Sequence, residues 1–152
     1  MRFPGGHGPT GRRLLGLGAL MVAGSLLPSA AVAVADDDPL PGPPLHHVQY
    51  TVFTEAPFRN AEIYYRNVDP ANFGDYSHNP YLFSPNVEAD LGPGQMWTMD
   101  VMLADPDQWA MVTASSLDSP KQPNFHCVIA VDGNVVVTNQ GPRGALCSIR
   151  LW

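Results

Sequence analysis

The amino-acid sequence predicts an all-β protein, an immunoglobulin-like β-sandwich of about seven strands held by one disulfide. Three observations lead to this prediction. From residue 47 onward, short runs of β-branched and aromatic residues alternate with turn residues. No stretch combines sustained 3.6-residue periodicity with a cap at each end, so we expect almost no helix. The two cysteines of the chain, Cys127 and Cys147, both lie in predicted strands.

The predicted strands are short and closely spaced, which is typical of a sandwich. Within residues 96–103, apolar side chains alternate with Thr98 and Asp100, as expected for a strand with one buried face. Asp132-Gly133-Asn134 predicts a tight hairpin turn, because Gly and Asn accept positive φ at little cost. The seven segments lie near residues 47–53, 60–66, 96–103, 109–116, 125–131, 134–139 and 145–151.

One region does not fit the strand pattern. Residues 69–94 are rich in Pro, Asn, Gly and Asp, and they predict a long loop with one short strand near residues 80–83. Long loops inside compact domains are uncommon and are often functional. The alternative interpretation is an irregular crossover between the two sheets.

The first 35 residues have the three parts of a secretory signal peptide. Residues 1–13 hold three arginines and no acidic residue, and the apolar run Leu14–Leu27 follows. Ala33 and Ala35 then form an A-x-A cleavage site. The resulting prediction is an exported chain, either secreted or in the periplasm and cell envelope. Its predicted parts are a signal peptide at 1–35, a Pro-rich leader at 36–46 and a β-sandwich domain at 47–152.

Two questions about this N-terminal segment stay open at the level of sequence. An uncleaved membrane anchor is the alternative to cleavage, and membrane association is expected only in that case. A spanning helix needs about 20 apolar residues, whereas the run 14–27 is shorter and its extension to Ala35 contains Gly, Ser and Pro. Arg12-Arg13 also raises twin-arginine export beside the general secretory route, although its flanking residues match that signal poorly.

The charge balance excludes one class of partner. The chain has 14 acidic and 8 basic residues, a net charge of −6. Cleavage after Ala35 would keep all 14 acidic residues and only five basic ones, which gives a net charge of about −9. Such a field repels phosphate backbones, so we expect no nucleic-acid partner.

The cysteines predict a disulfide and constrain the topology. An even pair in an oxidising compartment is expected to be bridged. If the last three predicted strands were consecutive hairpins of one sheet, Cys127 and Cys147 would lie about 9–10 Å apart. A disulfide needs Cα atoms within about 7 Å. We therefore predict that the last strand leaves this order and joins the other sheet or an edge.

Motifs for catalysis or metal binding do not stand out. The sequence lacks a G-x-S-x-G nucleophile turn, and His46-His47 is not accompanied by HExxH or Cys/His spacing. We interpret His126 as a surface strand residue. Met96, Met99 and Met102 cannot converge on a copper ion from one strand, so we expect them to fill the core. The prediction is a protein without catalytic residues, metal or cofactor, and not an enzyme.

Aromatic residues outside the predicted core form the candidate binding surface. They are Tyr76, Tyr81 and Phe83 in the long loop, together with Trp152. Clustered exposed aromatics can make a docking surface. The alternative is that they cover the open ends of the sandwich.

The segment His126–Val136 (HCVIAVDGNVV), followed by Cys147 in LCSIR, resembles the MmpS family of mycobacterial small membrane proteins. In that family a C-x-I-x-V-D-G-x-V hairpin precedes a second cysteine close to the chain end. The resemblance implies a periplasmic immunoglobulin-like sandwich and a non-enzymatic accessory role beside MmpL transporters, which export lipids and siderophores. It also implies an MmpL-type transporter or a lipidic cargo as the partner.

Two features depart from the MmpS pattern. MmpS proteins are anchored by an N-terminal helix, whereas the N-terminus here looks cleavable, and residues 69–94 look longer than the family's loop. The alternative is therefore a freely secreted β-sandwich binding protein that engages an envelope or host partner.

Overall fold

The structure is a computed structural model that describes residues 41–151. The predicted signal peptide, with its cleavage site at Ala33 and Ala35, lies outside the described residues, as does Trp152. Within the described part, no helix is long and apolar enough to cross a membrane. Residues 41–45 are exposed and carry no regular structure, and the first strand begins at His46.

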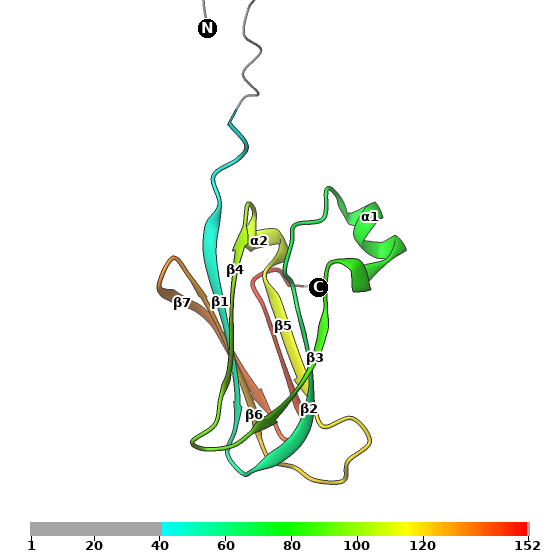
Figure 1. Ribbon diagram of the computed structural model, residues 1–152, viewed down its shortest axis with the longest axis vertical. Helices are drawn as coiled ribbons and strands as arrows, with labels where there is room; N and C mark the ends of the chain where they lie inside the picture. The colour runs from blue at the N-terminus through cyan, green and yellow to red at the C-terminus, as the bar shows by residue number, and fades with distance from the viewer. Residues whose placement is uncertain (1–40, 152) are drawn as a thin grey trace, which may run out of the picture. The chain divides into compact units, whose positions relative to one another are not determined.

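Eight antiparallel strands form two four-stranded sheets that pack against each other (Figure 1). The first sheet has the strand order β4-β1-β6-β7, made of Trp97–Leu103, His46–Thr54, Phe125–Val131 and Asn134–Gly141. The second has the order β3-β2-β5-β8, made of Asn86–Leu91, Phe58–Tyr65, Met111–Ser115 and Gly144–Ser148. The predicted β-sandwich is confirmed.

Alternation of side chains along each strand builds the core between the sheets. On β1, Val48, Tyr50 and Val52 point inward and are fully buried. Inward residues of β2 and β6, such as Ile63 and Ile129, join them in one continuous cluster that contains side chains from both sheets. Burial of such apolar side chains contributes roughly 1.5–3 kcal/mol each. The sandwich interior is therefore filled by its own side chains.

The disulfide joins the two sheets. Cys127 lies on β6 and Cys147 on β8, with their Cα atoms 5.9 Å apart. The turn after β7 leads β8 into the second sheet, where Cys147 is the register partner of Val112 on β5. This confirms both the predicted bridge and the prediction that the last strand leaves the order of its predecessors.

The region predicted as a long loop is more regular than expected. It contains the helix α1 (Phe73–His78), the 3-10 helix η1 (Pro80–Leu82) and the edge strand β3. The short strand predicted near residues 80–83 is wrong, because Pro80 starts a 3-10 turn there and the strand forms only at residue 86. The edge strand β3 (Asn86–Leu91) is therefore the strand that was not among the seven predicted ones.

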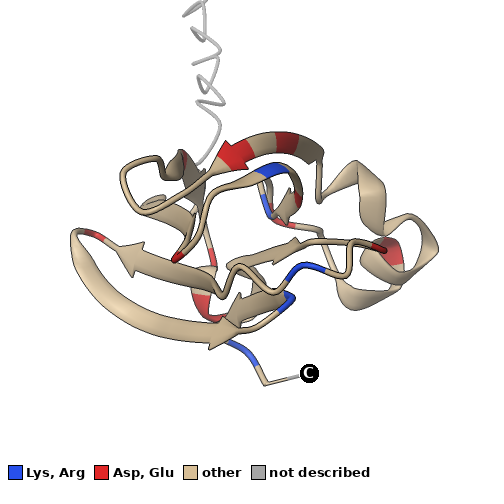
Figure 2. Cartoon of the chain, turned by 90° about the horizontal axis from the view of Figure 1, so that it is seen from below, with Lys and Arg blue, Asp and Glu red and all other residues tan. Residues whose placement is uncertain are grey.

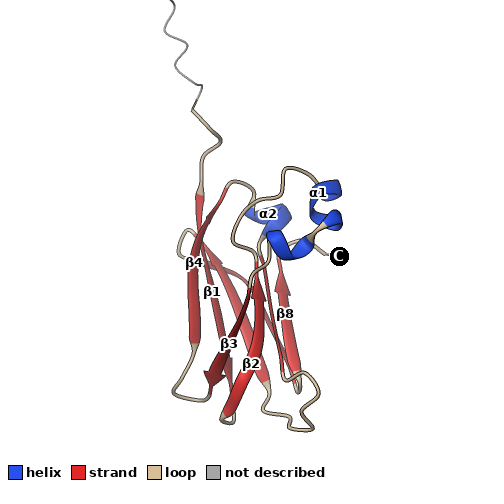
Figure 3. Ribbon diagram, turned by 45° about the vertical axis from the view of Figure 1, so that its right-hand side comes forward, coloured by secondary structure: helices blue, strands red, loops and turns tan. Residues whose placement is uncertain are grey.

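A second short helix, α2 (Pro106–Trp109), lies between β4 and β5. The Asp105 side chain caps it by accepting a hydrogen bond from the Gln108 backbone N–H, and Pro106 occupies the first turn. The helices α1, η1 and α2 lie at the same end of the sandwich (Figure 3). All three are too short to show helical periodicity in the sequence.

The expected core role of the three methionines is only partly correct. Met99 packs against the core, whereas Met96 and Met102 are 61% and 49% exposed. The reason is the strand alternation itself, which turns residues 96 and 102 away from the face that carries Met99.

Candidate functional site

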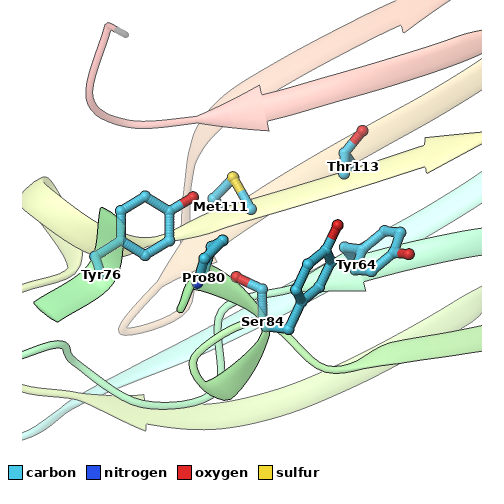
Figure 4. A pocket seen from close by; sticks show the side chains of 7 residues that line it. Tyr64, Tyr76, Pro80, Ser84, Met111 and Thr113 are labelled. Atoms are coloured by element: carbon cyan, nitrogen blue, oxygen red, sulfur yellow. The ribbon is translucent and has the colours of Figure 1, made fainter. Parts of the chain in front are cut away.

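A cleft of about 280 Å³ lies on the outer face of the second sheet (Figure 4). Its floor comes from β2 and β5, where Tyr64 and Thr113 are register partners and point away from the core. Its walls come from α1, η1 and the segment that follows η1. The lining residues are Tyr64, Tyr76, Pro80, Tyr81, Ser84, Met111 and Thr113.

Backbone hydrogen bonds hold the walls over the floor. The Asn67 N–H donates to the Phe83 carbonyl, and the Tyr65 N–H donates to the Pro85 carbonyl, at 3.3 Å each. The Asn72 side chain caps α1 by accepting from the Asp75 N–H. These bonds return the chain from α1 to the edge of β2, and they place residues 76–84 beside Tyr64.

Aromatic rings dominate the apolar part of the cleft. The rings of Tyr64 and Tyr81 are tilted against each other with centroids 6.1 Å apart. Tyr81 is 72% exposed, so its ring is available to a ligand. The Tyr64 hydroxyl donates to Glu62 at 3.1 Å, and partial burial together with this carboxylate raises the pKa of Tyr64.

Arg66 lies behind this cleft as a fully buried cation. Its Nη1 donates to Ser84 Oγ at 2.9 Å, and its Nε donates to the Trp109 carbonyl at 3.3 Å. Its Cζ lies 4.2 Å from the ring centroid of Tyr76 and 5.7 Å from that of Trp109, which is cation–π geometry. Nη2 has no hydrogen-bond partner among residues 41–151, and no carboxylate of this part lies within ion-pair distance of the guanidinium.

A family model, described as the Rv2576c beta-sandwich domain, matches residues 50–147 of this chain. The chain belongs to the Rv2576c β-sandwich family. It is similar to "Uncharacterized protein Rv2576c" of Mycobacterium tuberculosis and to "Uncharacterized protein Mb2606c" of Mycobacterium bovis. Each is 36% identical over 130 residues, which cover 86% of this chain and 80% of the relative.

The matched Rv2576c-family segment includes both bridged cysteines and every residue that lines the cleft. The resemblance to MmpS rests mainly on residues 126–136 and Cys147, and more loosely on residues 48–52, residues 61–65 and Trp97; it stays a prediction.

The geometry of the cleft suits binding. It combines apolar ring surfaces with the Ser84 hydroxyl and the Thr113 side chain, the usual composition of a small-ligand site. In the part of the chain that the structure describes, no group of three His, Cys, Asp or Glu side chains could hold a metal ion. The predictions that the protein is not an enzyme and has no cofactor stay predictions.

The structure brings two of the four predicted binding residues together. Tyr76 and Tyr81 line the cleft, whereas Phe83 lies beyond η1 in a separate hollow with Leu82. The sequence interpretation missed the remaining lining residues and Arg66. Strand alternation could have indicated Tyr64 and Arg66. One of the adjacent Tyr64 and Tyr65 must face outward, and Arg66 is two residues after Tyr64.

The histidines of the first sheet are paired with carboxylates. His46 Nδ1 lies 2.7 Å from Asp132, His47 Nε2 lies 2.9 Å from Asp100, and His126 Nε2 lies 2.8 Å from Glu55. His126 also stacks on Phe53 with ring centroids 4.7 Å apart. His126 therefore lies on the outer face of β6 and packs against neighbouring side chains, in agreement with its interpretation as a surface strand residue. His78 is exposed on α1.

Proposed function

We propose that this Rv2576c-family protein is a non-enzymatic exported binding protein whose ligand docks in the aromatic cleft. The observation that carries the proposal is the convergence of three tyrosines, from β2, α1 and η1, on one hollow outside the sheet. Tyrosine supplies large contact area together with a hydrogen-bonding group, which is why it is frequent in binding sites.

The disulfide supports an exported location, and the charge limits the partners. Bridged cysteines persist in oxidising compartments and are rare in the cytosol, and the Cys127–Cys147 bridge ties the two sheets together. Acidic positions outnumber basic ones over the described domain (Figure 2). This surface disfavours nucleic acids and anionic membranes as partners.

The size of the cleft limits the ligand. Sites for drug-sized molecules measure about 300–1,000 Å³. At about 280 Å³ this cleft holds one or two rings or a short apolar group. A lipid would place only one part of itself here, since the space between the sheets is filled by the core cluster.

Affinity capture from the cell envelope, followed by analysis of the bound small molecules and lipids, tests the proposal. The wild-type protein should retain a compound that Tyr81→Ala loses. Thr98→Ala, on the exposed face of β4, is the matched control and should retain it. Equal recovery by all three proteins would show that the cleft is not the binding site.

The finer proposal is an accessory role in MmpL-type export of lipids or siderophores, which rests on the resemblance of the β6–β7 hairpin to MmpS proteins. A large membrane transporter that co-purifies with the intact chain would support it. The alternative, a freely secreted binding protein, predicts a protein in culture filtrate whose mass corresponds to a start at or near Asp36. A full-length chain confined to membranes would contradict that alternative.

A further inference from the structure

The guanidinium of Arg66 is a buried charge without a counter-ion in the described part of the chain. Buried charges are normally paired, because taking an ion out of water costs several kcal/mol. The contacts of Arg66 with Tyr76, Trp109 and Ser84 are all to neutral groups. The positive charge of the guanidinium is therefore not neutralised by the described residues, and an anionic ligand could neutralise it.

The guanidinium lies directly behind the wall of the cleft. Tyr64 lies on the outer side of β2, and Arg66 directly follows the last residue of that strand, with its N–H donating to the Met111 carbonyl on β5. Ser84, which accepts from Arg66 Nη1, lines the cleft, and so does Tyr76, whose ring covers the guanidinium. Two of the three residues that touch the guanidinium therefore also line the cleft, and they lie between the charge and the cleft.

Two donors are available at this point. Arg66 Nη2 is buried and has no acceptor among the described residues. Ser84 Oγ accepts from Nη1, and its own hydrogen has no acceptor among residues 41–151. An arginine nitrogen and a neighbouring hydroxyl match the two oxygens of one carboxylate.

We propose that the cleft binds a small ring-bearing carboxylate. Its carboxylate accepts from Arg66 Nη2 and Ser84 Oγ, and its ring lies against Tyr81 and Pro80. This inference rests on the proposed binding function and names the ligand class of the same site.

A monoanion fits better than a phosphate dianion. The chain is acidic overall, and the Glu62 carboxylate is held beside the cleft by its hydrogen bond from Tyr64. A second negative charge on the ligand would add repulsion without a second cationic side chain in the lining of the cleft. A third phosphate oxygen would meet only neutral hydroxyl groups, such as that of Thr113.

Binding requires the ring of Tyr76 to shift, because Nη2 is sealed from the cleft. The helix that carries it, α1, has only six residues and none of them is buried. Moving the ring gives up its contacts with the guanidinium and with the Trp109 ring, and the arginine gains charge-assisted hydrogen bonds in exchange.

Titration of the full-length protein with benzoate, phenyl phosphate and benzyl alcohol tests the inference. Binding would be followed by nuclear magnetic resonance at the amides of Tyr81, Ser84 and Thr113. We expect benzoate to bind at least about tenfold more tightly than benzyl alcohol, since hydrogen bonds to charged groups are the stronger ones. We also expect it to bind more tightly than phenyl phosphate.

Two variants test the assigned contacts. Arg66→Met keeps the volume of the side chain and should abolish the preference for benzoate over benzyl alcohol. Ser84→Ala removes one donor and should reduce the preference by a few-fold, and it serves as the test if Arg66→Met does not fold. Circular dichroism establishes folding for each variant. An unchanged preference in a folded variant would overturn the inference.

The outcomes separate this inference from the proposed function. If benzoate and benzyl alcohol bind equally at these amides, the cleft is a binding site but the carboxylate assignment is wrong. If phenyl phosphate binds most tightly, the assignment to carboxylates is likewise wrong. If no compound shifts the cleft amides, both the inference and the binding function of the cleft fail.

Discussion

On the outer face of the sheet β4-β1-β6-β7, polar side chains pair with one another. His47 pairs with Asp100 and His126 with Glu55, each at less than 3 Å. This face also carries a hollow, lined by Phe53, His126 and polar side chains of β7. On the outer face of the sheet β3-β2-β5-β8, tyrosine side chains surround the cleft. The inner faces of the two sheets, in contrast, contribute alike to one apolar cluster.

The difference between the two outer faces bears on where a ligand could bind. Paired polar groups satisfy each other and leave little for a ligand to gain. Rings such as Tyr81, held outside the core at 72% exposure, bury their apolar surface only when something docks on them. We therefore expect the inner faces to determine stability, and the proposed binding site lies on the outer face of the second sheet.

The largest effect is expected from matched truncations on the two inner faces. Ile63 on β2 and Ile129 on β6 are both fully buried. Ile63→Ala and Ile129→Ala should each lower the free energy of unfolding by about 2–5 kcal/mol, because each leaves a cavity. Urea denaturation measures both values. A change below about 0.5 kcal/mol in either variant, the range of surface substitutions, would show that the faces are not equivalent.

Loss of the disulfide should rank next. The bridge closes a loop with a sequence separation of 20. Replacing both Cys127 and Cys147 by Ala should cost about 3 kcal/mol. Thermal unfolding with and without a reducing agent provides the control. Reductant should shift the wild-type Tm toward that of the double variant and leave the variant unchanged.

Truncation in the cleft should separate binding from stability. Tyr81→Ala should change the free energy of unfolding by no more than about 0.5 kcal/mol, since the side chain is exposed. The same substitution should weaken benzoate and benzyl alcohol alike, because it removes ring contact and no charge. Calorimetry and urea denaturation of Tyr81→Ala and Thr98→Ala give the comparison. Strong destabilisation by Tyr81→Ala would show that this outer face contributes to the stability of the fold.

The smallest effect is expected from acid on the first sheet. Hydrogen bonds from His46 and from the His47 backbone hold the pKa of Asp132 below its usual value. Hydrogen bonding by Asn124 and His126 lowers the pKa of Glu55 in the same way. A lowered pKa in the folded state contributes stability above the ordinary carboxyl pKa of about 4, and this contribution is lost as the pH falls through the folded value.

Thermal unfolding of wild type and Asp132→Asn between pH 6 and pH 3 measures this contribution. The wild-type Tm should fall more steeply with acid than that of the variant. The difference should shrink in high salt, because the pair is exposed and therefore screened. Parallel curves for the two proteins would show that the pair does not act on stability.

The fold could be predicted from sequence where the signal was local or covalent. Alternation such as Trp97, Met99 and Val101 against Thr98 and Asp100 marks a strand without knowledge of its neighbours. The cysteine spacing also predicted that the last strand leaves the order of its predecessors, with the other sheet as one of two possible places for it. β3 was missed because its Asn, Glu, Ala and Asp residues are poor strand formers, and pairing with β2 decides its conformation.

The cleft could be predicted only in part, because its floor depends on a non-local register. Tyr64 meets Thr113 through the pairing of β2 with β5, which no local pattern specifies. Arg66 was missed for a different reason. Arginine is almost never fully buried unless it is paired, so a sequence interpretation places it in solvent.

The bridge between β6 and β8 also orders events in time. A chain is synthesised from its N-terminus, so seven of the eight strands exist before Cys147 does. Until then Cys127 is a thiol that can react with the wrong partner, including another copy of the same chain. The pairing of β8 with β5 is what holds the two cysteines at a Cα separation of 5.9 Å, so strand docking and formation of the native disulfide favour each other.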